Sequence, residues 1–138
     1  MAVYFFTEDI SFTLDKEDQT AAWVEQILKQ EGYKAENISY VFCSDNHLLE
    51  LNQQYLNHDT LTDIITFDHS EEKENLEADI FISIDRVKEN AATLEKEFTD
   101  ELHRVIIHGL LHLIGLKDKT KAEKQEMRKK EDACLSLR

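Results

Sequence analysis

The stretch RVIIHGLLHLIGLKDKT, residues 104–120, predicts a helix that ends in a sharp turn. It contains His108 and His112, four positions apart, and two of the three glycines of the chain. Side chains at positions i and i+4 lie on one face of a helix with their Cβ atoms about 5–6 Å apart, so the two imidazoles can converge on one cation. Gly115 follows where the helix would end in a left-handed cap. The turn would then bring Asp118 toward the open side of the pair.

These three side chains match the ligands of a zinc ion. Zinc accepts imidazole nitrogen and carboxylate oxygen, and catalytic zinc sites combine three protein ligands with an open fourth position. We therefore predict one zinc ion per chain, bound by His108, His112 and Asp118 on a central helix. The alternative is a chance histidine pair on an amphipathic helix. Zinc peptidases carry a glutamate after the first histidine, whereas this chain has Gly109, which disfavours peptide hydrolysis and lets a substrate or a neighbouring strand approach closely.

The rest of the sequence alternates strands and helices. Short runs rich in β-branched and aromatic residues predict four strands, at residues 3–6, 37–44, 61–67 and 78–84. Apolar residues at helical spacing predict five helices, at residues 20–32, 44–56, about 85–94, about 99–114 and about 120–135. These elements predict an α/β (α+β) fold, with a four-stranded mixed sheet and about five helices packed on it. The length predicts one domain over residues 1–138, with Trp23 and Phe67 in its core.

Composition and charge narrow the classes of protein. Residues 1–10 do not resemble a signal peptide, and no apolar run approaches the roughly 20 residues of a membrane span, so we expect a cytoplasmic protein without membrane contact. Cys43 and Cys134 are far apart in sequence and are expected to be reduced thiols. The net charge of −13 argues against indiscriminate binding along a nucleic-acid backbone.

One segment departs from this acidic composition. Residues 117–130 carry seven lysines and arginines against three acids. Such a run is commonly a solvated helix face, but its position directly after the histidine pair also fits a binding surface. Arg104 lies one helical turn before His108, where either a phosphate contact or a surface ion pair is possible.

Three ordered blocks of the sequence resemble one known family. HGLLHLIGLKD, residues 108–118, resembles the H-G-x-L-H-L-x-G-Y-D-H signature of the YbeY family, the bacterial zinc-dependent endoribonucleases of rRNA maturation. LNQQYLNHDTLTDIITF, residues 51–67, is similar to L-N-x-x-Y-R-x-x-D-x-P-T-D-V-L-S-F, and ADIFIS, residues 78–83, to G-D-I-x-I-S. The resemblance implies a single-strand-specific endoribonuclease that acts in maturation of the 16S rRNA 3′ end and in ribosome quality control. The implied partners are rRNA and the small ribosomal subunit or its proteins.

The chain departs from the family pattern at several positions. Asp118 stands where the family has its third histidine ligand, and Leu56 stands where it has an arginine. If that arginine contacts phosphate, another cation must replace it here, such as Arg104 or Lys117. The remaining departures are Leu61, Ala78, Leu116 and, again, Lys117, which replace a proline, a glycine, a tyrosine and an aspartate.

For several other residues, the sequence allows two interpretations. Thr62 and Asp63 open a predicted strand, where they either bond at the strand end or border the cleft that the family block implies. Asp79 either accepts a hydrogen bond from a histidine ring or caps a strand. The remaining histidines are expected at the surface; they are His47, His58, His69 and His103. His58 is also a candidate for lining the cleft. If Asp118 is not the third ligand, His58 or His69 is expected to take its place.

No residue is assigned as general base by the sequence, and Arg104 is the candidate phosphate contact. Two other functions compete with the nuclease. One is a metal-stabilised ribosome-binding assembly factor with little catalysis, which the missing family arginine would suit. The other is a zinc hydrolase of a different substrate, which Gly109 disfavours.

Overall fold

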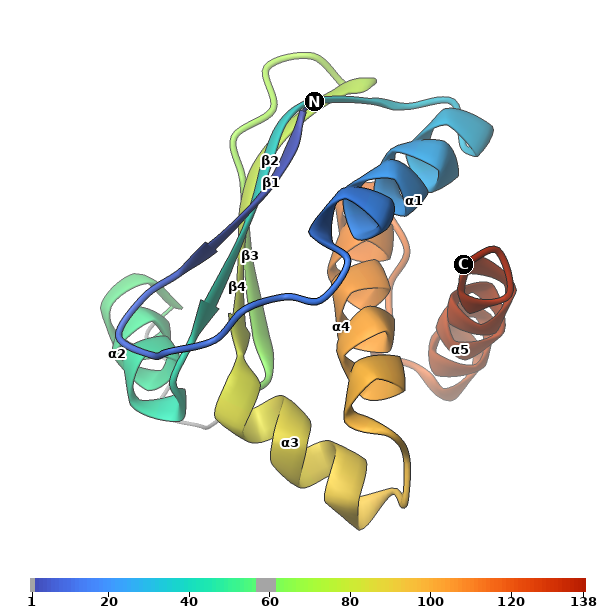
Figure 1. The fold of residues 1–138 in the computed structure, drawn as a ribbon. Helices are drawn as coiled ribbons and strands as arrows, with labels where there is room; N and C mark the ends of the chain where they lie inside the picture. The colour runs from blue at the N-terminus through green and yellow to red at the C-terminus, as the bar shows by residue number, and fades with distance from the viewer. Residues whose placement is uncertain (1, 57–61) are drawn as a thin grey trace.

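A computed structural model describes residues 2–56 and 62–138 of the chain (Figure 1). Its strands are β1 (Val3–Thr7), β2 (Lys34–Cys43), β3 (Ile64–Asp68) and β4 (Asn75–Ser83). They form one sheet in the order β1-β2-β4-β3. The strands β1, β2 and β4 run parallel to one another, whereas β3 runs antiparallel to β4. The predicted four-stranded mixed sheet is confirmed.

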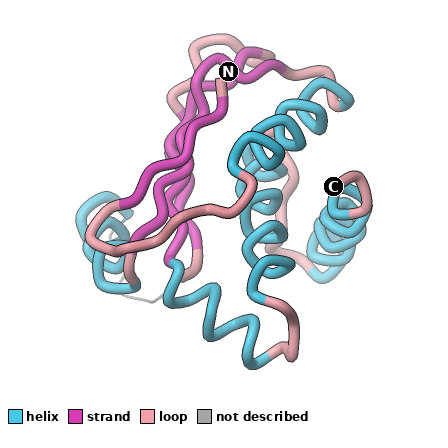
Figure 2. Tube along the Cα trace, viewed as in Figure 1, coloured by secondary structure: helices cyan, strands magenta, loops and turns pink. Residues whose placement is uncertain are grey.

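In the part of the chain that the structure describes, five helices pack around this sheet, as predicted. They are α1 (Glu17–Gln30), α2 (Asp45–Leu56), α3 (Ile84–Thr93), α4 (Phe98–Leu113) and α5 (Lys121–Leu135). Helices α1 and α4 cover one face of the sheet and α2 lies on the other, while α5 lies outside α4 (Figures 1 and 2). None of the described helices combines the length and apolarity that crossing a membrane requires.

Helix α4 is held between the sheet and α5 by an apolar stripe that faces the strands. Side chains at helical spacing along it are buried, among them Leu102, Val105, Ile106 and Leu110. They belong to one hydrophobic cluster with Leu76, Ile80 and Ile82 of β4, which share a face because successive strand residues point to opposite faces of a sheet. Tyr40 of β2 also donates a hydrogen bond to the carbonyl of Ile106 across 3.1 Å. This packing leaves the half-exposed side of α4 free for polar residues.

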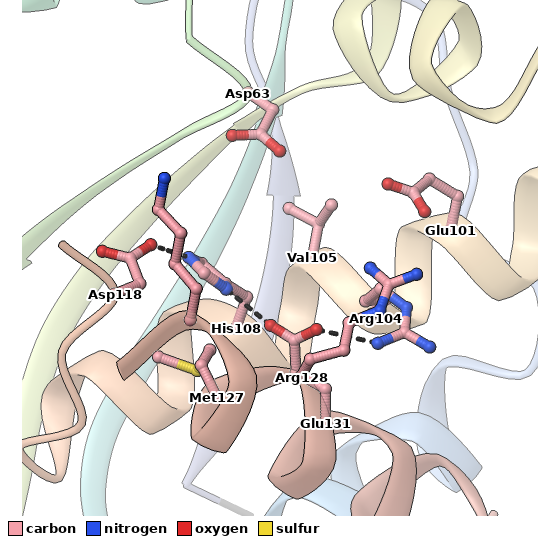
Figure 3. Close-up of a pocket in the computed structure, with 10 residues that line it drawn as sticks. Asp63, Glu101, Arg104, Val105, His108, Asp118, Met127, Arg128 and Glu131 are labelled. Carbon is pink, nitrogen blue, oxygen red and sulfur yellow. Dashed lines mark hydrogen bonds and ion pairs between the residues drawn. The ribbon is translucent and has the colours of Figure 1, made fainter. Parts of the chain in front are cut away.

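Gly109 lets α4 approach the sheet closely. A Cβ at this position would lie 2.6 Å from Cδ1 of Ile64 in β3 and 3.2 Å from Cγ2 of Ile80 in β4. Both distances are shorter than the ordinary contact between carbon atoms. Of the two reasons predicted for this glycine, the structure supports a close neighbouring strand. The approach also places Asp63, which directly precedes β3, near the histidine side of α4 (Figure 3).

Several boundaries and burials differ from the sequence prediction. Helix α1 begins at Glu17, three residues before the predicted start, and β3 begins at Ile64, so Thr62 and Asp63 precede it. Trp23 is buried as predicted, and its indole N–H donates to the carbonyl of Cys134 across 2.9 Å. Phe67 is only half-buried, because β3 is an edge strand, and it packs in a smaller cluster on the α2 face.

Candidate metal centre

The end of α4 places the third candidate ligand. Gly115 has a φ of 106°, in the left-handed region that favours glycine. Its N–H donates to the carbonyl of His112 across 3.0 Å, and the N–H of Leu116 donates to the carbonyl of Leu111 across 3.0 Å. These two bonds form a Schellman motif, which confirms the predicted left-handed cap and turns the chain back over the helix. Asp118 thereby reaches the two histidines.

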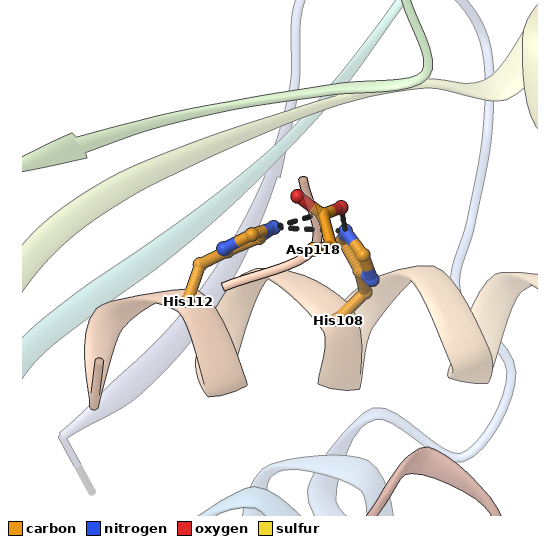
Figure 4. Close-up of side chains that lie close together, drawn as sticks. All are labelled: His108, His112 and Asp118. Carbon is orange, nitrogen blue, oxygen red and sulfur yellow. Dashed lines mark hydrogen bonds and ion pairs between the residues drawn. The ribbon is translucent and has the colours of Figure 1, made fainter. Parts of the chain in front are cut away.

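The three side chains converge on one point (Figure 4). The Nε2 atoms of His108 and His112 are 3.0 Å apart. Oδ2 of Asp118 lies 3.2 Å from Nε2 of His108 and 3.4 Å from Nε2 of His112. Ligands at tetrahedral angles around a zinc ion, with bonds of about 2.0–2.2 Å, are separated by about 3.3–3.6 Å. The donor triangle therefore has nearly the size that a metal of this kind requires, and the group could hold a metal ion.

The outer nitrogens of both rings fix their orientation. Nδ1 of His112 lies 2.9 Å from the carbonyl oxygen of Leu116, which can only accept a hydrogen bond, so Nδ1 carries the hydrogen. Nδ1 of His108 lies 2.6 Å from Oε2 of Glu131, and the same reasoning applies to an ionised carboxylate. In the neutral rings both Nε2 lone pairs then point at the Asp118 carboxylate. Three electron-rich atoms in one small space could hold a cation between them.

Glu131 also joins this centre to α5 (Figure 3). Its Oε1 accepts a hydrogen bond from Arg104 across 2.8 Å, and Arg104 donates a second to Asp132 across 2.6 Å. The side chain of Glu131 is only 5% exposed. Of the two interpretations of Arg104, the structure therefore supports the ion pair, because both of its carboxylate partners, Glu131 and Asp132, lie on α5.

Glu131 was not among the predicted site residues, although one signal in the sequence could have indicated it. Met127, Glu131 and Cys134 are the buried residues of α5 and follow one another at helical spacing. An acidic residue inside an otherwise apolar stripe needs a buried partner, because an unpaired buried charge is costly. The partners here are His108 and Arg104, on the neighbouring helix.

The electrostatics of the centre favour positive charge. Burial disfavours the charged form of His108, but the hydrogen bond and the negative charge of Glu131, followed by Asp118 and Asp63, outweigh it and raise the pKa of His108. Burial raises the pKa of Asp63, and the charge of His108 opposes that shift in part. Asp63, His108 and Asp118 line one cavity of about 320 Å³, so Asp63 borders the cleft as well as the strand end.

Among the described residues, the other histidines do not join the centre. His69 is exposed and pairs with Asp79 across 3.1 Å, so Asp79 does contact a histidine ring, but not one of the candidate ligands. The expected surface position does not hold for His103, which is half-buried against the ring of Trp23. His47 is likewise half-buried beside Phe81. The prediction for His58 lies outside the described residues, as does that for Leu61.

The basic segment forms the connection to α5 and most of that helix. Thr120 and Glu123 cap the start of α5 with a reciprocal pair of hydrogen bonds. Lys130 pairs with Glu31 of α1 across 2.8 Å. Lys124 and Arg128 instead line the cavity beside His108 and Asp118, whereas Lys117 is exposed and does not line it. The segment therefore borders the candidate metal centre.

Comparisons with known proteins found similar sequences and a similar fold. The family profile described as Endoribonuclease YbeY matches residues 5–137. A curated relative from Cytophaga hutchinsonii, named Endoribonuclease YbeY, is 54% identical over 99% of this chain and 95% of its own length. A relative of the same name from Amoebophilus asiaticus is 47% identical over 96% of this chain and 90% of its own length. Among solved structures, the solution structure of a Thermotoga maritima protein matches with a TM-score of 0.67 and 26% identity, over 96% of this chain and 86% of that one.

Proposed function

The chain belongs to the YbeY family of endoribonucleases, and from that premise we propose that it is a zinc-dependent enzyme that cuts single-stranded RNA. Its role would be the maturation of the 16S rRNA 3′ end and ribosome quality control in the cytoplasm, with the small ribosomal subunit or its proteins as partners. Residues 1–138 would act as one domain. The observation that carries the proposal is the convergence of His108, His112 and Asp118 at separations that fit one metal ion.

The donor set favours zinc over other divalent ions. Magnesium and calcium prefer oxygen ligands, whereas two imidazoles with one carboxylate suit zinc or a related transition metal. When bound by His108, His112 and Asp118, zinc would supply Lewis acidity, which can polarise a phosphoryl oxygen and acidify water near neutral pH. Glu131 and the carbonyl of Leu116 hold the two rings so that Nε2 faces the site. The cavity bordered by Asp63 gives a phosphodiester access to it.

Metal removal tests the proposal directly. Zinc-loaded protein should cleave a single-stranded RNA and spare the same sequence in a duplex, and a chelator should stop cleavage until zinc is added back. Cleavage products on a gel and elemental analysis of the same samples provide the measurement. If zinc-loaded protein leaves RNA intact but still sediments with small ribosomal subunits, the protein is a binding factor, and the nuclease proposal is wrong.

Asp118 allows a sharper test of the ligand set. Asp118→Ala should leave a two-histidine site that loses zinc readily to a competing chelator, whereas Asp118→His should restore the family pattern and retain zinc at least as well as the wild type. A carboxylate leaves less positive charge on zinc than a neutral imidazole does. The pH–activity profile of Asp118→His should therefore rise at lower pH than that of the wild type. Unchanged zinc retention in Asp118→Ala would remove Asp118 from the ligand set.

A further inference from the structure

The cations around the metal cavity differ in whether they are free to bind an anion. Arg104 is occupied, because Glu131 and Asp132 accept hydrogen bonds from its guanidinium at 2.8 and 2.6 Å. Lys124 and Arg128 line the same cavity and are exposed. In the described residues, 2–56 and 62–138, neither forms an ion pair or a side-chain hydrogen bond. These two cations are therefore available at the mouth of the site.

The same two residues also line a second hollow along α5. Lys121, Gln125 and Lys129 complete its basic and polar lining, at helical spacing with Lys124 and Arg128. The carboxylate of Asp132 also lines this hollow, but Arg104 pairs with it. Since Lys124 and Arg128 belong to both hollows, the basic lining of the second hollow reaches the mouth of the metal cavity. The metal cavity itself is also lined by carboxylates, which are those of Asp63, Glu101, Asp118 and Glu131.

This continuity is unusual in a chain of net charge −13. An acidic protein repels a polyanion over most of its surface, so a local basic track guides the polyanion to one path. The stripe from Lys121 to Arg128 spans about 10 Å along the helix axis, which is enough for two to three backbone phosphates.

We propose that Lys124 and Arg128 form a phosphate-binding subsite at the mouth of the metal cavity, from which one flank of the RNA strand runs along α5. The subsite replaces Arg104 as the phosphate contact, because the guanidinium of Arg104 is paired with Glu131 and Asp132. It contacts the backbone and not the bases, so it contributes affinity without sequence preference. The inference rests on the proposed function, because it assigns a path to the RNA of that reaction.

The test measures binding and catalysis separately. Binding of a fluorescent ten-nucleotide single-stranded RNA to chelator-treated full-length protein is followed by anisotropy at increasing salt. Each phosphate contact contributes about 0.7 to the slope of log K against log salt concentration for single strands, so Lys124→Gln/Arg128→Gln should lower the magnitude of the slope by about 1.4. The matched control is Lys130→Gln, which removes a charge from the same helix where Glu31 already neutralises it.

Kinetics and conservative variants complete the test. With zinc-loaded protein, the double variant should raise KM for the ten-nucleotide RNA and leave kcat and zinc content unchanged, and a dinucleotide substrate should not distinguish it from the wild type. Lys124→Arg and Arg128→Lys should keep the wild-type slope. A wild-type slope in the double variant, or an equal drop in Lys130→Gln, overturns the subsite. Failure of the wild type to cleave any RNA refutes the nuclease instead, while the anisotropy result still decides whether the track binds RNA.

Discussion

Replacing His112 with alanine is expected to remove the metal and to lower RNA cleavage by at least about 1,000-fold, since Lewis-acid catalysis contributes several kcal/mol to the barrier. The variant would keep only His108 and Asp118, and two ligands hold zinc poorly against competing water and buffer. The apolar stripe of α4 is untouched by the change, so the fold should persist. Elemental analysis, circular dichroism and cleavage of a labelled single-stranded RNA measure the three quantities.

His69 provides the matched control. It is also a histidine beside a carboxylate, with 3.1 Å between its Nε2 and Oδ2 of Asp79, but it is exposed and outside the donor triangle. His69→Ala should therefore retain zinc and cleave RNA like the wild type. Full zinc content in His112→Ala would contradict the assignment, and so would equal loss of zinc in the two variants.

Glu131→Ala is expected to destabilise the folded state by up to about 3–5 kcal/mol, the cost of removing one partner from a buried ion pair, because Arg104 would keep only the exposed Asp132. The side chain of Glu131 is 5% exposed and that of Arg104 is 19% exposed, so water compensates little for the missing carboxylate. The change also frees the ring of His108, whose Nδ1 loses its acceptor. Loss of such a partner typically weakens metal binding by about 10–100-fold. Urea unfolding and zinc competition with a chelator measure the two effects.

Two variants distinguish the effect of breaking the buried ion pair from the effect of removing any negative charge. Asp132→Ala removes the other partner of Arg104, but Asp132 is exposed, so the cost should stay below about 1 kcal/mol. Glu131→Gln keeps an oxygen that can accept from His108, so its zinc affinity should lie between those of wild type and Glu131→Ala. If Glu131→Ala unfolds at the same urea concentration as Asp132→Ala, the buried network does not stabilise the protein.

The sequence predicts the donor triangle because all of its geometry is local. His108 and His112 are one helical turn apart, and the cap at Gly115 returns the chain toward them. Glu131 was not predicted, because its contact with His108 joins two helices and spans 23 positions. The ion pairs of Arg104 depend on the same contact between α4 and α5. The sequence alone therefore did not distinguish an ion pair from a phosphate contact at this residue.

The helices and strands could be predicted because their sequence patterns are local. The order of the strands in the sheet could not be predicted in this way. Each strand and helix follows from the spacing of its own apolar residues, and all nine agree with the structure to within a few residues. The insertion of β4 between β2 and β3 depends on pairings such as Ser39 with Asp79, forty positions away. β4 also begins at Asn75, before its apolar run, because the long neighbour β2 offers Lys34 and Ala35 as partners. The sequence around Asn75 does not indicate that β2 provides these pairing partners.

The cap at Gly115 also has a consequence for the order of folding. The three donors lie within eleven consecutive residues, 108–118, whereas the first sheet pairing joins Val3 to Ile38. Closing a short loop costs less entropy than closing a long one, so the three donors can gather before the sheet exists. If they bind zinc as proposed, a partly folded chain would compete with the native protein for the ion, and such competition reduces the stabilisation that a ligand provides. Zinc should therefore raise Tm by less than its affinity for the native protein implies, while it promotes early formation of the end of α4.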